Sequence, residues 1–124
     1  MPVPILKQGS YLIASIQSAL SDTEVLELRD DLADRIGRFR SRGIIIDVAA
    51  LDVIDSFVAR SLRNIARTAN LRGAATVIVG IQPDVAVAMV QFRLNLEPLQ
   101  TALDLEEALE LLDRNTRRRE HDGR

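Results

Sequence analysis

Two short runs of apolar residues constrain the fold of this chain more than any other feature of its sequence. One reads Ile-Ile-Ile-Asp-Val at positions 44–48, and the other reads Ala-Thr-Val-Ile-Val at positions 75–79. Apolar side chains at consecutive positions of a strand must be covered on both faces, as in parallel sheets flanked by helices. The segment from Ser56 onward lies between the two runs, carries apolar residues at helical spacing and should end at Arg72-Gly73. A strand, a helix and a second strand in this order predict an α/β fold.

The N-terminal part adds a hairpin and a helix to this unit. Residues 3–7 and 11–17 are β-prone runs around a Gln-Gly-Ser connection, which predicts two paired strands. Ser21 and Glu24 have the spacing of a capping box, so a helix should start there. Its apolar residues recur at three- or four-residue spacing, and we expect it to end near residues 41–43.

The C-terminal part predicts two further helices. Pro83 suits the first turn of a short helix, and Asp104 with an acidic residue three positions later suits the start of a longer one. Pro98 interrupts the segment between them, so only a brief edge strand is expected around Leu99. Together the elements predict an α/β mixed sheet of four to five strands with about four helices.

The length of the chain, 124 residues, suits a single hydrophobic core. Its composition, 47% hydrophobic and 27% charged, is that of a folded globular protein. No apolar residue occurs from Arg114 onward, where five arginines face one glutamate and one aspartate, a formal charge of 5 − 2 = +3. We therefore expect one domain over residues 1–113 and a basic, disordered tail over residues 114–124.

Charge and cysteine content disfavour several classes of partner. The formal net charge is −2, so no global basic field attracts nucleic acid or an anionic membrane. The chain has no cysteine, which rules out disulfides and suits a reducing compartment such as the cytoplasm. The N-terminal residues lack a basic region and a long apolar stretch, so neither a signal peptide nor a membrane span is expected.

Residues that could support catalysis are few. His121, the single histidine, lies in the basic tail without a rigid support, and no glycine-rich phosphate loop occurs. Asp47, Asp52 and Asp55 could gather a hard cation after a central strand, or they could simply face water. A phospho-accepting receiver domain would need a further acidic pair and a late lysine, which the chain does not offer. We expect no enzyme activity, no cofactor and no metal, although a small metal- or nucleotide-dependent enzyme built on these aspartates is a remote alternative.

Ser56 is the residue most suggestive of function. It lies where a helix N-cap is expected, so its hydroxyl would face unpaired backbone N–H groups at the positive end of the helix dipole. Phosphorylation would add about −1.5 to −2 charges beside Asp55 and Asp52 and change what that surface binds. The alternative is that the serine serves only as a cap.

The order of motifs resembles that of STAS domains, the anti-sigma-factor antagonist fold of bacterial regulators. Ile-Ile-Ile-Asp47 followed by Val-Ile-Asp-Ser56 is similar to the signature of the family. Within it, the likeness is greatest to the single-domain stressosome scaffolds of the RsbS type, and it extends to about Leu112. The motifs that carry this likeness are Pro-Ile-Leu-Lys7, Ser-Ile-Gln17, Ile-Asp-Ser-Phe57, Gly-Ile-Gln-Pro83 followed by Val-Ala-Val87, and Thr-Ala-Leu-Asp-Leu-Glu106.

The resemblance implies a cytoplasmic scaffold that self-associates and assembles with STAS-containing co-antagonists of the RsbR type. It would sequester a switch serine/threonine kinase of the RsbT type and release it when Ser56 is phosphorylated under stress. A serine phosphatase would reset that state, with Asp55 and Asp52 as modulating neighbours. Many stand-alone anti-sigma-factor antagonists have a small residue and then glycine after the serine, whereas this chain has Phe57-Val58. That departure favours a scaffold over the alternative, a direct antagonist that displaces a sigma factor by binding its anti-sigma kinase.

Overall fold

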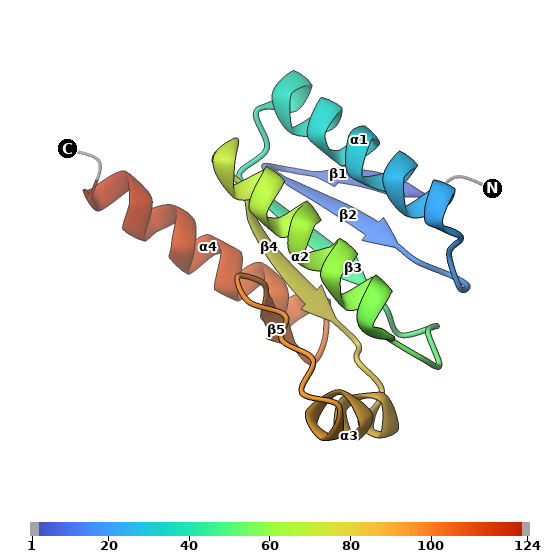
Figure 1. Ribbon diagram of the computed structural model, residues 1–124. Coiled ribbons are helices and arrows are strands. Elements are labelled where there is room, and N and C mark those ends of the chain that lie inside the picture. Colours follow the sequence, from blue (N-terminus) through green and yellow to red (C-terminus); the bar gives the residue numbers. More distant parts are fainter. Residues whose placement is uncertain (1–2, 123–124) are drawn as a thin grey trace.

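The computed structural model describes the backbone of residues 3–122 and the side chains of residues 3–117. Its strands form one mixed sheet in the order β1-β2-β3-β4-β5, in which β1 is antiparallel to β2 and the other neighbours are parallel (Figure 1). The sheet has five strands and the described chain has four helices, as predicted. The elements are β1 Ile5–Gln8, β2 Tyr11–Ser15, α1 Asp22–Phe39, β3 Gly43–Asp47, α2 Ser56–Leu71, β4 Ala75–Val79, α3 Pro83–Gln91, β5 Gln100–Ala102 and α4 Leu105–Asp122.

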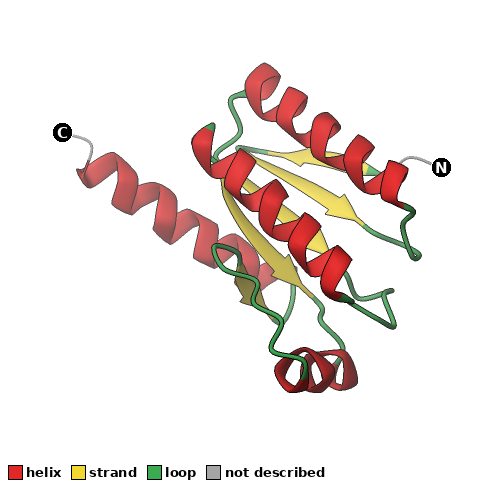
Figure 2. Cartoon of the chain, viewed as in Figure 1, coloured by secondary structure: helices red, strands yellow, loops and turns green. Residues whose placement is uncertain are grey.

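Helices cover both faces of the sheet (Figure 2). Helices α1 and α2 lie side by side on one face, and α4 packs against β3, β4 and β5 on the other. On β3, Ile44 and Ile46 belong to the core under α1 and α2, whereas Ile45 belongs to the core under α4. All three side chains are fully buried. This two-sided burial explains why the run at 44–48 lacks alternating polar residues.

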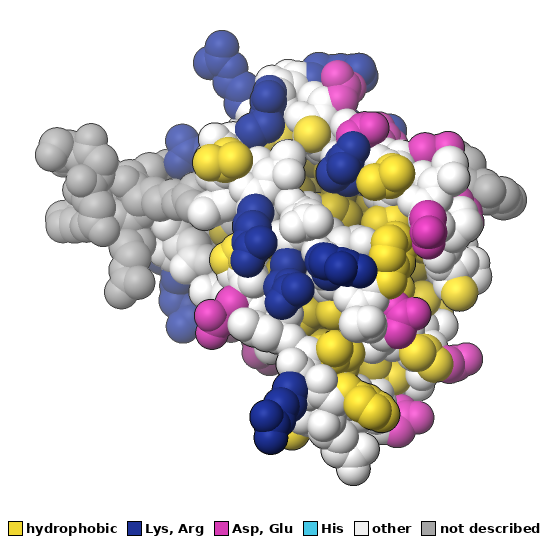
Figure 3. Space-filling view, in the orientation of Figure 1, with side chains coloured by type: hydrophobic (Ala, Val, Ile, Leu, Met, Phe, Trp, Pro, Cys, Tyr) yellow, Lys and Arg dark blue, Asp and Glu magenta, His cyan; other side chains and the backbone are white. Residues whose placement is uncertain are grey.

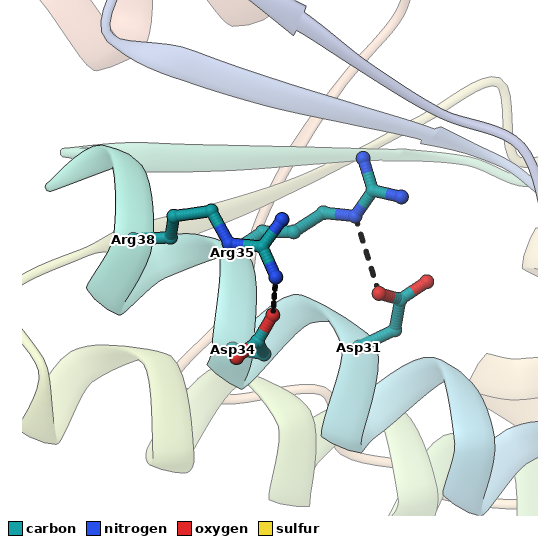
Figure 4. Close-up of polar contacts among 4 residues, drawn as sticks. All are labelled: Asp31, Asp34, Arg35 and Arg38. Atoms are coloured by element: carbon teal, nitrogen blue, oxygen red, sulfur yellow. Dashed lines mark hydrogen bonds and ion pairs between the residues drawn. The ribbon is translucent and has the colours of Figure 1, made fainter.

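Helix α1 begins with the predicted capping box. The Glu24 N–H donates to Ser21 Oγ at 3.2 Å, and the Ser21 N–H donates to Glu24 Oε1 at 3.0 Å. Farther along, Arg35 Nε pairs with Asp31 Oδ1 at 3.2 Å and Arg38 Nη2 pairs with Asp34 Oδ2 at 2.8 Å (Figure 4). The Arg38–Asp34 pair is exposed, and an exposed pair at this spacing stabilises a helix by only about 0.3–0.5 kcal/mol. The Arg35–Asp31 pair is half-buried.

Helix α4 is fixed to the sheet by its first half. Ala108 and Leu112 are buried there, and the Tyr11 hydroxyl donates to the Asp113 carboxylate. Burial and this hydrogen bond raise the pKa of Tyr11. The helix then passes Asp113 without a break and extends beyond the sheet (Figure 1).

The helical backbone of 114–122 differs from the disordered tail that the sequence predicted. Absence of apolar residues excludes a core, but it does not exclude a helix. Glu110 precedes Arg114 and Asp113 precedes Arg117 by four positions, a spacing that favours helix. The side chain of His121 lies outside the described residues.

Candidate functional site

The loop between β3 and α2 holds Ser56 at the carboxyl end of the parallel strands. Leu51 and Ile54 anchor this loop because their side chains are buried in the core under α1 and α2. Between them, Val53 turns outward and is 68% exposed. In open α/β sheets the carboxyl ends of the strands are where ligands and partners usually bind. The loop therefore presents Ser56 at the edge of the sheet best placed for recognition.

A second loop, between β4 and α3, supports the first. The Gln82 side-chain amide donates to the Ala49 carbonyl at 2.8 Å. Gly80 has φ +81°, and a Cβ added there would lie 2.9 Å from Ala49 Cβ. Only glycine combines this backbone angle with so close an approach. These contacts join the two loops and set the start of α3 beside the start of α2.

Asp55, and not Ser56, is the N-cap of α2. The Asp55 carboxylate accepts a hydrogen bond from the Val58 N–H at 2.8 Å, and Ser56 is the first residue of the helix. The prediction that Ser56 is the cap is therefore wrong by one residue. Ser56 is exposed, and its hydroxyl makes no hydrogen bond within the described part of the chain. The side chain of Ser56 is therefore accessible and has no structural role in capping α2.

Ser56 lines a groove of about 590 Å³ between the start of α2 and α3. Asp52, Asp55 and Asp84 stand in the lining with it. The predicted neighbours Asp52 and Asp55 are thus brought to the serine, and α3 adds a third carboxylate that sequence reasoning missed. Hydrophobic and acidic side chains mix in the lower part of Figure 3, where α2 begins and α3 lies. The remaining lining residues are Val53, Ile54, Val85, Ala88, Phe92 and Leu94.

A smaller hollow of about 140 Å³ lies on the other side of the Ser56 loop, between α1 and α2. Val58, Ser61 and Ile65 line it from α2, with apolar side chains of α1 opposite. Val53 and Asp55 border both hollows. The tip of the loop is therefore a ridge between two concave surfaces.

Asp47 does not join the other two aspartates considered for a metal site. Its carboxylate accepts the Ala49 N–H at 2.9 Å and is absent from the lining of the Ser56 groove. Among the residues that the structure describes, no three His, Asp or Glu side chains are placed to hold a metal ion. No described helix combines the length and the apolar character that crossing a bilayer would require.

The sequence profile of the STAS domain matches residues 3–108. The chain therefore belongs to the STAS domain family, in agreement with the mixed sheet and the Ser56 loop described above.

Its likeness to solved structures extends to the RsbS type within that family. A serine-to-glutamate variant of RsbS from Moorella thermoacetica is 36% identical, with a TM-score of 0.77 over 93% of this chain and 97% of that one. A chain from a solved structure of the stressosome, which is described as a signal integration and transduction hub, is also 36% identical. Its TM-score is 0.73 over 92% of this chain and 99% of that one.

A longer relative matches over part of its length. The RsbT co-antagonist protein RsbRA of Bacillus subtilis is 29% identical over 98 residues, which are 75% of this chain and 36% of that protein. The chain thus spans about a third of the length of RsbRA.

Proposed function

We propose that this STAS domain is a phospho-regulated scaffold of a stressosome. In the unmodified state it sequesters a switch serine/threonine kinase of the RsbT type. Under stress that kinase phosphorylates Ser56 and is released, and a serine phosphatase restores the first state. The domain itself carries out no chemistry, and its cytoplasmic location stays a prediction from sequence.

The observation that carries this proposal is the state of the Ser56 hydroxyl. It is exposed at the first position of a helix, and the cap is supplied by Asp55 instead. A phosphoryl transfer needs an accessible hydroxyl, and this one can react without loss of a helix cap. The product would add about −1.5 to −2 charges beside Asp52, Asp55 and Asp84, which is enough to change the binding properties of the groove.

The relatives support the scaffold assignment. Two of the compared structures are RsbS and a chain of the stressosome, each matched over nearly its whole length. RsbRA is named as a co-antagonist of RsbT. Self-association and assembly with RsbR-type proteins therefore form part of the proposal.

Intact-mass spectrometry after incubation with ATP and an RsbT-type kinase tests the site. Wild type should gain the mass of one phosphate, and Ser56→Ala should gain none. Ser61→Ala is the matched control: Ser61 lies on the same helix, but its hydroxyl donates to the Phe57 carbonyl at 2.8 Å. Modification that persists in Ser56→Ala would show that another residue is the acceptor.

Kinase retention tests the switch itself. Immobilised Ser56→Ala should retain the kinase in the presence of ATP, whereas Ser56→Asp should bind it more weakly. Equal release from the two variants would contradict the proposal. Light scattering of the protein co-expressed with an RsbR-type partner should show a megadalton-scale assembly, which a direct anti-sigma-factor antagonist would not form.

A further inference from the structure

Three arginines form a line along α2 that begins at Ser56. Arg60, Arg63 and Arg67 follow Ser56 at intervals of four, three and four residues, which places all four side chains on one stripe of the helix. Helix α2 contains no acidic residue. Dark blue side chains gather accordingly in the middle of Figure 3, over α2. We call Arg60, Arg63 and Arg67 the arginine stripe.

The arginine stripe has no internal counter-charge. None of its guanidinium groups forms an ion pair within the described residues, and Arg63 Nε is buried without a hydrogen-bond partner. On α1, by contrast, Arg35 and Arg38 each pair with an aspartate. Three neighbouring positive charges repel one another, so the stripe would be stabilised by an external acidic group.

Helix α1 does not supply that group. The flank of α2 that faces α1 is marked by Val58, Ser61 and Ile65, which line the hollow between the two helices. Helical periodicity places the arginine stripe on a different side of α2, turned away from α1. Arg60 and Arg67 are exposed, so these two ends of the stripe are open to a partner, whereas Arg63 is half-buried between them.

A protein interface of standard size that is centred on Ser56 would reach the arginine stripe. A standard interface covers about 800 Å² per partner, which corresponds to a disc of about 16 Å radius. Arg67 lies eleven positions after Ser56, a distance of about 16.5 Å along the helix axis. A kinase whose active site reaches Ser56 would therefore cover much or all of the stripe.

Nucleic acid fits this surface less well than an acidic protein does. The whole chain has a formal charge of −2, and the Ser56 end of the stripe borders Asp52, Asp55 and Asp84. These carboxylates would repel a continuous phosphate backbone. A folded partner can instead match an acidic patch to the arginines and a basic one to the aspartates.

We propose that the arginine stripe is the electrostatic docking surface for an acidic face of the kinase that modifies Ser56. This inference rests on the proposed function and adds to it a route for release. Phosphoserine at position 56 would lie one turn before Arg60, where opposite charges attract. With about −1.5 to −2 added charges, the stripe would fall from +3 to about +1 to +1.5. The kinase would thus weaken its own docking surface by its reaction.

The test uses the double variant Arg60→Glu/Arg67→Glu and measures its affinity for an RsbT-type kinase. RsbT of Bacillus subtilis is the probe. Both arginines are exposed, so the fold should be unchanged by circular dichroism and thermal unfolding. We expect Kd to rise about 10-fold or more, and the dependence of Kd on salt between about 50 and 300 mM to become shallower. Arg114→Glu is the control, because Arg114 is an exposed arginine on α4, across the sheet. Its Kd should stay within about twofold of wild type.

The possible outcomes separate this inference from the proposed function. If wild type is phosphorylated on Ser56 while the double variant binds the kinase as tightly as wild type, the docking surface is wrong and the proposed function stands. If the kinase neither binds nor modifies wild type, both are wrong. Arginine-dependent binding of poly(U) RNA, or a change in the oligomeric state of the double variant alone, would overturn the kinase assignment of the stripe.

Discussion

The carboxylate of Asp55 accepts the backbone N–H of Val58 at 2.8 Å, and this hydrogen bond separates two tasks that one residue could have combined. Asp55 stabilises the start of α2, so the Ser56 hydroxyl is left free for the phosphorylation proposed above. A serine used as the cap would have to give up its hydrogen bond, or share it with a phosphate, at each reaction. With the aspartate as cap, phosphorylation can change the surface charge while the helix stays intact.

This division of tasks predicts different stability effects at two adjacent positions. Asp55→Ala should lower the free energy of unfolding by about 1 kcal/mol, the usual cost of a lost cap. Ser56→Ala should change it by less than about 0.5 kcal/mol, as for exposed residues without a structural contact. Urea unfolding of both variants measures the difference, and Asp55→Asn, which can still accept the Val58 N–H, is the control. A larger loss of unfolding free energy in Ser56→Ala than in Asp55→Ala would show that the serine, and not the aspartate, caps the helix.

Local patterns in the sequence predicted most of the fold. The capping box at Ser21 and the proline at the first turn of α3 are confirmed because each depends on residues close together in the chain. The nearly continuous β-branched run at 44–48 predicted a strand buried on both faces, and β3 is that strand. The hairpin is confirmed as well, with Gln8 paired to Tyr11 around the turn.

The differences arise where local preference is ambiguous or contacts are distant. Aspartate and serine are both favoured caps, so the sequence could not decide between Asp55 and Ser56. The edge strand is Gln100–Ala102, and Leu99, around which it was expected, is instead a buried residue just before it. Asp84 lies in α3, which follows β4, and it reaches the Ser56 groove because β4 is the neighbour of β3 in the sheet. The spacing of the arginine stripe was visible in the sequence, but its lack of counter-charges required the structure.

The contact between the two loops of the site makes Gly80 hard to replace. A Cβ at this position would lie 2.9 Å from Ala49 Cβ and 3.2 Å from Ala49 Cα, and the backbone has positive φ. Gly80→Ala should therefore destabilise the protein by more than about 1 kcal/mol, because strain and a clash with backbone add together. Gly9→Ala is the matched control: Gly9 also has positive φ but has nothing within 4 Å of the added Cβ. Thermal unfolding should show the larger loss for Gly80→Ala, and equal losses would contradict the close approach of the loops.

The docking of α4 predicts that its buried leucine is essential to stability. Leu112 is 1% exposed and packs with Tyr11, Ile45 and Val77. Leu112→Ala should cost about 2–5 kcal/mol, the range for large-to-small changes in a core. Leu103→Ala should cost less than about 0.5 kcal/mol because Leu103 is 84% exposed. Denaturant unfolding compares the two, and a small effect at Leu112 would show that α4 contributes little to the fold.

The capping box of α1 predicts how acid affects stability. The hydrogen bond from the Ser21 backbone N–H holds the pKa of Glu24 below its ordinary value of 4.5. A carboxylate with a lowered pKa in the folded state stabilises that state above the ordinary pKa, and the contribution is lost as the pH falls through the lowered value. Glu24→Gln keeps an oxygen that can accept the same N–H but cannot titrate.

Wild type should therefore lose stability relative to Glu24→Gln as the pH is lowered from about 6 to about 3. Unfolding measured across this range gives the difference, and Glu27→Gln, on the same helix but outside the capping box, is the control for loss of one carboxylate. If the free energy of unfolding changes with pH in the same way for wild type, Glu24→Gln and Glu27→Gln, the charge of Glu24 does not contribute to the cap. A steeper loss for wild type than for Glu24→Gln, with no such gap for Glu27→Gln, would assign the acid sensitivity to the hydrogen bond between Ser21 and Glu24.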